Sequence, residues 1–184
     1  KRSSELFTGG TIPDARIGEI YRQLGAQMQN LVLVGMPGCG KSSIGTLLAQ
    51  RLNRPFVDAD AEIEAAAGMP IPEFFRLHGE DAFRDLESRV LAELGKRSGA
   101  VIATGGGAVL REENYTSLHQ NGVIVWLTRD LSRLPVDGRP VSQSTSLDAL
   151  FAARRARYER FADHTIDNNG APDETVRAIL EALR

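Results

Sequence analysis

The glycine-rich stretch GMPGCGKS, from Gly35 to Ser42, is the feature that most restricts the fold of this chain. It matches the pattern G-x-x-x-x-G-K-[ST] of phosphate-binding loops. A short apolar run at 31–34 precedes the loop, and apolar residues at helical spacing follow it over 44–52. A strand, a glycine-rich turn and a helix in this order surround an anion with backbone N–H groups and the positive end of the helix. The sequence therefore predicts a nucleotide-binding fold of the P-loop type.

The residue types in this loop suit a nucleoside triphosphate. Glycines let the backbone curl around phosphate oxygens without Cβ clashes. Lys41 is expected to reach the β- and γ-phosphates, and the Ser42 hydroxyl is expected to bind Mg²⁺. The residues predicted to bind the nucleotide here are Gly35, Met36, Pro37, Gly38, Cys39, Gly40, Lys41, Ser42 and Ser43.

Strands and helices alternate along the rest of the chain. After the first strand, further strands are expected at 55–57, 100–103, 122–127 and 165–167. Helices are expected at 59–67, 81–94, 147–161 and 172–183, with another between the third and fourth strands. This order predicts a three-layer α/β/α fold with a five-stranded parallel sheet and ligands at the carboxyl ends of its strands. In most such sheets the second strand lies beside the first.

The first thirty residues do not share this pattern. Residues 1–13 are polar and contain glycine, which is typical of a linker or tail. Asp14 is expected to cap a helix whose apolar residues share one face: Ile17, Ile20, Tyr21 and Leu24. We interpret 1–29 as an N-terminal extension or an interdomain linker, and 30–184 as the P-loop domain. The chain does not begin with Met, so an upstream fused domain and a simple N-terminal helix both stay open.

Composition excludes several classes of protein. The 184 residues carry 22 Lys and Arg against 24 Asp and Glu, a formal net charge of −2. This balance argues against partners such as nucleic acid or a membrane surface. No run approaches the roughly 18 apolar residues of a membrane helix. A single cysteine forms no intrachain disulfide, so we expect a cytoplasmic protein.

Two carboxylates, Asp58 and Asp60, follow the second expected strand. Residues i and i+2 of a strand share one face, so both side chains are expected to face the γ-phosphate region. One could orient the metal while the other takes the proton of an accepting hydroxyl. Either could also cap the next helix, which would not exclude those roles.

Arg84 stands three residues before Glu87 on an expected helix. Such a pair is either a surface ion pair or a guanidinium braced for an anionic substrate, and the sequence leaves both interpretations open. Gly105, Gly106 and Gly107 follow the third strand directly. They indicate either close approach of the backbone to a ligand or a flexible turn.

Residues 135–146 are rich in Pro, Ser and Gly and lack helical periodicity, so we expect them to form a mobile lid. Arg139 in this stretch could fold over the phosphates and offset charge in the transition state. A loop arginine is otherwise simply solvated, so this role depends on the rest of the pattern.

The ordered set of motifs resembles the shikimate kinase family of small P-loop kinases. The set consists of the loop GMPGCGKS, Asp-Ala-Asp, Phe-Arg-x-x-Glu, Thr-Gly-Gly-Gly, Arg-Pro and Arg-x-x-x-Tyr, from about Leu31 to the C-terminus. The resemblance implies a Mg²⁺-dependent enzyme that transfers the γ-phosphoryl group of ATP to the 3-hydroxyl of shikimate. A kinase domain of this kind is expected to be monomeric.

The resemblance also implies a role for individual residues. Asp58 would help Ser42 to hold Mg²⁺, and Asp60 would grip the accepting hydroxyl and act as base. Arg84 and Arg154 would clamp the shikimate carboxylate beside the backbone of Gly105, Gly106 and Gly107. Arg139 would be the lid arginine, and Arg133 would lie against adenine. The choice of Arg154 depends on its four-residue offset from Tyr158.

The sequence departs from the family pattern where Arg-Pro-Val-Ser replaces Arg-Pro-Leu-Leu and where the stretch from Trp126 to Arg139 is short. Two other functions stay open: a gluconate or polyol kinase, and a nucleotide-binding regulatory module without catalysis. The arginines at 84 and 154 favour a ring carboxylate over gluconate. A carboxylate at 60 argues against the module, because binding alone does not need an acceptor-side group.

Overall fold

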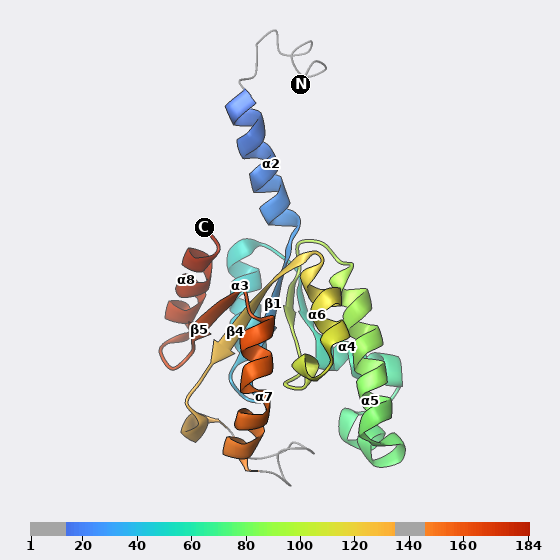
Figure 1. Cartoon of the computed structure of the whole chain (residues 1–184). Coiled ribbons are helices and arrows are strands. Elements are labelled where there is room, and N and C mark those ends of the chain that lie inside the picture. The colour runs from blue at the N-terminus through green and yellow to red at the C-terminus, as the bar shows by residue number, and fades with distance from the viewer. Residues whose placement is uncertain (1–13, 135–145) are drawn as a thin grey trace.

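The computed structural model describes residues 14–134 and 146–184, in which one parallel sheet lies between two layers of helices (Figure 1). The strand order is β2-β3-β1-β4-β5, and every neighbouring pair is parallel. The predicted three-layer α/β/α fold with five parallel strands is therefore confirmed. The strands are β1 (Asn30–Val34), β2 (Phe56–Asp58), β3 (Val101–Ala103), β4 (Gly122–Thr128) and β5 (His164–Asp167).

The second strand does not lie beside the first, so that expectation is wrong. Val101 of β3 pairs with Leu31 of β1 and with Phe56 of β2, which places β3 between them. The chain therefore crosses β3 when it runs from β1 through α3 (Lys41–Leu52) to β2. This connection runs toward the β2 edge of the sheet, whereas the later connections, from β2 to β3, β3 to β4 and β4 to β5, run toward the β5 edge. With right-handed connections, α3 then lies on the other face of the sheet from the helices that follow β2, β3 and β4.

The helices cover both faces and bury the central strands. All five residues of β1 are buried, as expected for a strand with helices on both sides. Trp126 of β4 is also buried and stacks on Tyr158 with ring centroids 5.6 Å apart. The other helices of the domain are α4 (Ala59–Ala67), α5 (Ile71–Gly95), α6 (Glu112–His119), α7 (Leu147–Phe161) and α8 (Pro172–Ala182), with 3-10 turns η1 (Ala108–Leu110) and η2 (Leu131–Arg133).

Helix α5 begins ten residues before the helix predicted at 81–94. Gly79 interrupts it with φ 79° and ψ 178°, values that lie outside helical geometry. The part before this kink, 71–78, is a helix that the sequence pattern did not predict. Its first N–H group, that of Ile71, donates to the carboxylate of Glu64 at 2.9 Å, which supplies a cap that Pro70 lacks.

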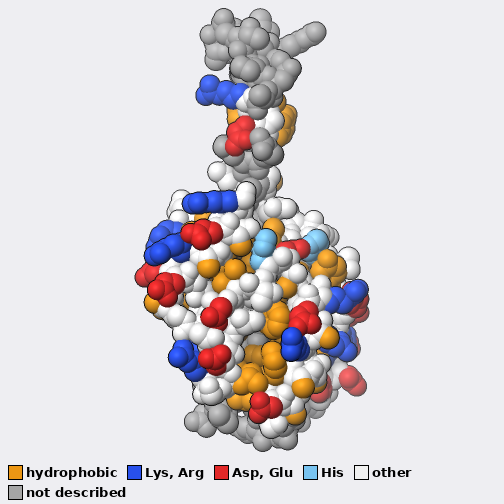
Figure 2. Space-filling view, turned by 60° about the vertical axis from the view of Figure 1, so that its left-hand side comes forward, with side chains coloured by type: hydrophobic (Ala, Val, Ile, Leu, Met, Phe, Trp, Pro, Cys, Tyr) orange, Lys and Arg blue, Asp and Glu red, His pale blue; other side chains and the backbone are white. Residues whose placement is uncertain are grey.

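Helix α2 (Asp14–Met28) confirms the expected N-terminal helix, and it projects away from the sheet as a narrow column (Figures 1 and 2). Its apolar side chains are exposed: Ile20, Tyr21, Leu24 and Met28. None of the helices in 14–134 and 146–184 is long and apolar enough to span a membrane. On the face in Figure 2, acidic and basic side chains are interspersed rather than gathered by sign.

Candidate active site

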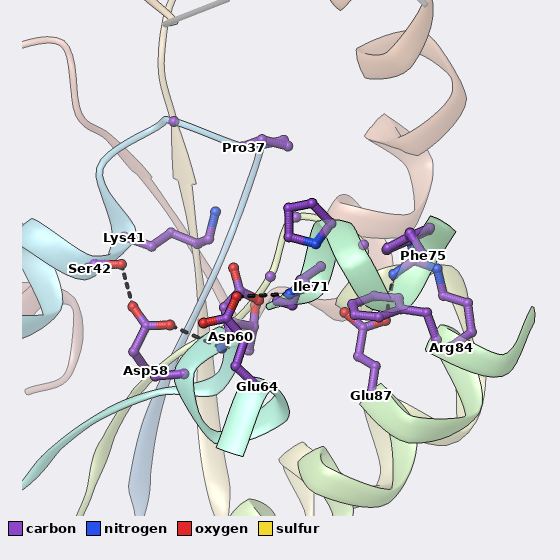
Figure 3. Close-up of a pocket in the computed structure, with 18 of the residues that line it drawn as sticks. Pro37, Lys41, Ser42, Asp58, Asp60, Glu64, Ile71, Phe75, Arg84 and Glu87 are labelled. Carbon is purple, nitrogen blue, oxygen red and sulfur yellow. Dashed lines mark hydrogen bonds and ion pairs between the residues drawn. The ribbon is translucent and has the colours of Figure 1, made fainter. Parts of the chain in front are cut away.

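A cavity of about 670 Å³ opens at the carboxyl ends of the central strands (Figure 3). One side is the phosphate-binding loop, and the other sides come from α4, α5, α7 and the glycines after β3. The lining residues are Pro37, Gly38, Gly40, Lys41, Ser42, Ser43, Asp58, Asp60, Ala61, Glu64, Ile71, Pro72, Phe75, Phe83, Arg84, Glu87, Thr104, Gly105, Gly106, Gly107, Leu150 and Arg154. Most of the residues expected at the site from the sequence therefore share one cavity.

Glycines give the phosphate-binding loop its shape. Gly38 and Gly40 have φ of 81° and 99°, in the left-handed region that side chains rarely adopt. The helix α3 starts immediately after Gly40, so its N-terminal N–H groups face the cavity mouth. Met36 and Cys39 are buried in the core and are not part of the lining. Any contact of those two residues with a nucleotide is through the backbone.

The Lys41 ammonium group folds over its own loop. Its Nζ donates to the carbonyl oxygens of Gly35 at 2.9 Å and Met36 at 3.0 Å, and the residue is 8% exposed. A compact charge held in this position supplies the positive potential that a polyphosphate requires.

Ser42 and Asp58 connect the loop to the end of β2. The Ser42 hydroxyl donates to Oδ2 of Asp58 at 2.7 Å. The other oxygen, Oδ1, accepts from the backbone N–H of Asp60 at 3.0 Å and so caps α4. Asp58 is thus both a helix cap and a neighbour of the phosphate-binding loop.

Asp60 lies in the first turn of α4 rather than in the strand. We expected both carboxylates on one side because residues i and i+2 of a strand share a face, and this reason is wrong because Asp60 is not in the strand. Both side chains nevertheless line the cavity, because the cap turns the chain at Asp58 and the helix carries Asp60 inward (Figure 3).

Oxygen ligands suited to Mg²⁺ are present at this junction. Among residues 14–134 and 146–184, no three His, Cys, Asp or Glu side chains gather as ligands of a metal ion. Mg²⁺ keeps several waters and binds through one or two protein oxygens together with substrate phosphates. The hydroxyl of Ser42 and the carboxylate of Asp58 fit that ligand set.

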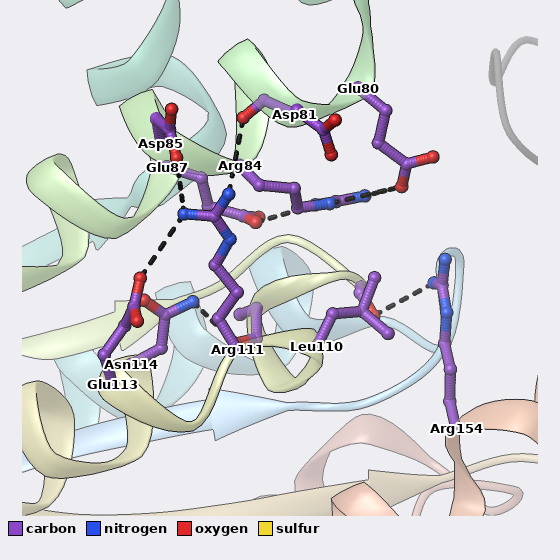
Figure 4. Close-up of polar contacts among 12 residues, drawn as sticks. Glu80, Asp81, Arg84, Asp85, Glu87, Leu110, Arg111, Glu113, Asn114 and Arg154 are labelled. Atoms are coloured by element: carbon purple, nitrogen blue, oxygen red, sulfur yellow. Dashed lines mark hydrogen bonds and ion pairs between the residues drawn. The ribbon is translucent and has the colours of Figure 1, made fainter.

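Arg84 is buried at the opposite end of the cavity from the loop (Figure 3), and Figure 4 shows its polar contacts. Its Nη1 lies 2.6 Å from Oε2 of Glu87, and the two side chains are 8% and 2% exposed, so the surface ion pair is excluded. Its Nε and Nη2 reach Oε1 of Glu80, and its guanidinium lies 5.0 Å from the ring centroid of Phe83. Burial raises the pKa of Glu87, and the charge of Arg84 opposes that rise.

The three glycines after β3 each allow a close approach. A Cβ on Gly105 would lie 2.7 Å from Oδ1 of Asp60, and a Cβ on Gly106 would lie 2.6 Å from Cγ of Pro37. A Cβ on Gly107 would lie 2.7 Å from Cζ of Arg84. The glycines therefore let the backbone pack against cavity residues, and the flexible turn is not needed to explain them.

Arg154 and Tyr158 of α7 share one acceptor in this glycine segment. Arg154 Nη1 and the Tyr158 hydroxyl donate to the carbonyl oxygen of Gly106 at 3.1 Å and 2.6 Å. Both residues are buried, and burial raises the pKa of Tyr158, which keeps its hydroxyl a donor. The four-residue offset used to choose Arg154 places it one helical turn from Tyr158, with its side chain in the cavity lining.

Arg133 and Arg139 are both predicted to contact the nucleotide, and the structure describes only the first of them. Arg133 lies on η2, where its Nη1 donates to the carbonyl oxygen of Asn169 at 2.6 Å, and it is not part of the lining. Its place against adenine stays a prediction. Arg139 lies outside the described residues, as does nearly all of the expected lid at 135–146.

Sequence reasoning missed several walls of the cavity. Apolar and polar side chains from α4, α5, α7 and the end of β3 had no assigned role: Glu64, Ile71, Pro72, Phe75, Thr104 and Leu150. Only Pro72 carried a usable signal, because proline in the first turn marks the start of a helix. Recognising it would have predicted the helix at 71–78.

Comparisons with known proteins agree on one family. The model of the family described as shikimate kinase matches residues 37–184. Shikimate kinase of Nitrobacter winogradskyi is 48% identical over 158 residues, which cover 80% of this chain and 73% of the relative. Shikimate kinase of Bradyrhizobium diazoefficiens is 45% identical over 177 residues, which cover 90% of this chain and 84% of the relative.

Solved structures give the same result. Shikimate kinase from Acinetobacter baumannii in complex with shikimate matches with a TM-score of 0.76 and 34% identity, over 86% of this chain and 94% of that one. Shikimate kinase from Bacteroides thetaiotaomicron matches with a TM-score of 0.75 and 28% identity, over 85% and 98% of the two chains. A gluconokinase from Sinorhizobium meliloti matches with a TM-score of 0.50 and 18% identity, a likeness that extends to the fold alone.

Proposed function

Because this chain belongs to the shikimate kinase family, we propose that it transfers the γ-phosphoryl group of ATP to the 3-hydroxyl of shikimate. The observation that carries the proposal is the composition of the cavity at the carboxyl ends of the strands. It begins at a phosphate-binding loop and ends at two buried arginines, Arg84 and Arg154. A small hydroxylated carboxylate complements the arginine end, since a guanidinium binds a carboxylate with two parallel hydrogen bonds.

The loop side of the cavity binds the nucleotide. Backbone N–H groups of the loop and the first turn of α3 surround the phosphates, and Lys41 exchanges the carbonyls of Gly35 and Met36 for phosphate oxygens. Ser42 and Asp58 would hold Mg²⁺, which would supply positive charge that neutralises the phosphate oxygens. These residues keep the γ-phosphate at the end of the cavity that faces Asp60.

The other side binds the acceptor. Asp60 accepts the proton of the 3-hydroxyl as the hydroxyl oxygen bonds to the γ-phosphorus and the bond from that phosphorus to the leaving ADP oxygen breaks. Arg84 and Arg154 orient the acceptor by its carboxylate. Glu87 and the Gly106 carbonyl hold these two guanidinium groups in place before the acceptor arrives.

Several finer expectations accompany the proposal and stay predictions. Arg139 closes over the phosphates as a lid arginine, which excludes water as a competing acceptor. Arg133 lies against adenine. The domain at 30–184 works as a monomer in the cytoplasm, and 1–29 links it to an upstream domain or extends it.

A coupled assay of ADP release across hydroxylated acids tests the proposal. ADP release that depends on shikimate and fails with gluconate is the expected result. Turnover of gluconate without turnover of shikimate would favour the polyol kinase. Binding of ADP or ATP, with no release of ADP that depends on an acceptor, would favour the regulatory module.

A further inference from the structure

Asn168 is a buried polar residue outside the cavity, directly after β5, and it contacts the back of the phosphate-binding loop. Its Nδ2 donates to the carbonyl oxygen of Cys39 at 2.7 Å, and the residue is 5% exposed. We infer that Asn168 is a positioning residue that sets nucleotide affinity by fixing the orientation of the Cys39–Gly40 peptide. This inference rests on the proposed function only in taking the loop as the nucleotide site.

The orientation of the Cys39–Gly40 peptide determines where its N–H group points. The peptide between Cys39 and Gly40 is trans, so its C=O and N–H groups point in opposite directions. The carbonyl points outward to Asn168, and the N–H of Gly40 therefore points away from Asn168, to the inner side of the loop. Inward N–H groups are what bind an anion in such a loop. Holding the carbonyl thus holds a phosphate donor.

The amide of Asn168 is itself held in one orientation. The Thr175 hydroxyl, from α8, donates to Oδ1 of Asn168 at 2.8 Å. Thr175 is 2% exposed, so this bond is shielded from bulk solvent. With its acceptor end occupied, the amide presents its NH₂ group to Cys39. The chain of contacts thus runs from α8 through Asn168 to the loop.

The loop has a physical need for such an anchor. Gly38 and Gly40 flank Cys39, and glycine has more backbone freedom to lose than any other residue. A Cβ on Gly40 would lie 2.7 Å from Nδ2 of Asn168, so the two residues are in direct contact. An external hydrogen bond restricts the peptide at the position where the glycines leave it free. Binding of phosphate then costs less ordering of the loop.

The test compares Asn168→Ala with a matched control, Asn30→Ala. Asn30 is buried like Asn168, and both ends of its amide are bonded, to the carbonyl of Arg97 at 2.6 Å and the N–H of Ala100 at 3.0 Å. It lies at the start of β1, the opposite end of the sheet from the loop. Both variants should lower the melting temperature, since each loses two buried hydrogen bonds.

Affinity for the nucleotide should separate the two variants. Titration of ADP with Mg²⁺ and without acceptor should give a Kd about 10-fold higher for Asn168→Ala, and a Kd within about twofold of wild type for Asn30→Ala. In the coupled assay, the KM for ATP should rise by a similar factor while the KM for shikimate stays within about twofold. Thr175→Val, which keeps the shape of the side chain, should raise the ADP Kd in the same direction by about threefold.

Equal ADP affinities in the Asn168→Ala and Asn30→Ala proteins would overturn the inference and leave Asn168 a structural residue. Equal increases of both KM values would do the same. If Asn168→Ala does not fold, an unchanged ADP Kd in Thr175→Val would overturn it. Since ADP is titrated without acceptor, a failure to phosphorylate shikimate would contradict the proposed function and leave this test intact.

Discussion

Arg84 and Glu87 form an ion pair with 2.6 Å between Nη1 and Oε2, and neither side chain is more than a tenth exposed. The pair lies one helical turn apart on α5, at the acceptor end of the cavity. Removing one member of a buried pair leaves the other as an uncompensated charge. The stability of the protein and the position of Arg84 therefore both depend on the pair. These contacts hold the guanidinium of Arg84 in one orientation, as its proposed contact with a carboxylate requires.

Arg84→Ala should weaken binding of shikimate and leave binding of ATP unchanged. The lost charge-assisted hydrogen bonds correspond to about 1–3 kcal/mol, or an increase in the shikimate KM of about 5- to 150-fold. Steady-state kinetics with each substrate varied in turn measures this. Arg111→Ala is the matched control, because Arg111 pairs with Asp85 and Glu113 beside the same helix but does not line the cavity (Figure 4). A shikimate KM that changes equally in both variants would contradict the role of Arg84.

Glu87→Gln should alter how stability depends on pH. Burial raises the pKa of Glu87 above its ordinary value of 4.5, so the folded protein retains this proton at pH values where the unfolded chain has lost it. The free energy of unfolding of wild type minus that of Glu87→Gln should therefore be constant below pH 4.5 and decrease as pH rises above it. Urea unfolding of both proteins across this range measures the difference. An increase with pH would show that the charge of Arg84 outweighs burial.

Asp60→Asn should lower kcat by about 100-fold or more, because the amide cannot take the hydroxyl proton. The KM for ATP should stay within about twofold, since the proposed contact of Asp60 is with the acceptor. Asp58→Asn provides the contrast, because Asp58 bonds to Ser42 and should alter the dependence on Mg²⁺ concentration instead. Equal losses of kcat and ATP affinity in Asp60→Asn would remove the acceptor-side role.

Gly107→Ala should raise the KM for shikimate by about 10-fold through displacement of Arg84. The backbone of Gly107 has φ −97°, which alanine adopts without strain, so the effect isolates the contact of the new Cβ with the guanidinium. Gly25→Ala on α2 is the control. Nothing lies within 4 Å of its Cβ position, and alanine should leave activity unchanged and favour the helix by up to about 1 kcal/mol. An unchanged shikimate KM in Gly107→Ala would refute the steric argument.

The elements that are determined by residues close together in the sequence could be predicted. Leu147–Phe161 is a helix with the predicted bounds, and Ser146 caps it through a hydrogen bond to the N–H of Ala149. The order of strands could not be predicted, because pairing of β3 with both β1 and β2 depends on contacts far apart in the chain. The helix at 71–78 was hidden because Gly79 interrupts the helical periodicity that would have joined it to the rest of α5.

The same division applies to the site. The phosphate-binding loop is contiguous, so its residues could be read together, and the carboxylates and arginines could be chosen by motif. Their neighbours could not be predicted. Burial of Arg84 against Glu87, and the shared contact of Arg154 and Tyr158 with Gly106, arise only when α5, α7 and the end of β3 converge.

Asp58 and Asp60 are separated by one alanine, yet Asp58 bonds to Ser42 of the loop and Asp60 packs beside Gly105 on the acceptor side. The boundary between the two halves of the cavity therefore falls within the first turn of α4. In the proposed function, the residues that would contact the acceptor come from α4, α5, α7 and the glycine segment, whereas the loop and α3 would hold the donor. In evolution, a descendant of this fold can acquire a new acceptor through substitutions on one side of that turn and still use the same phosphate donor.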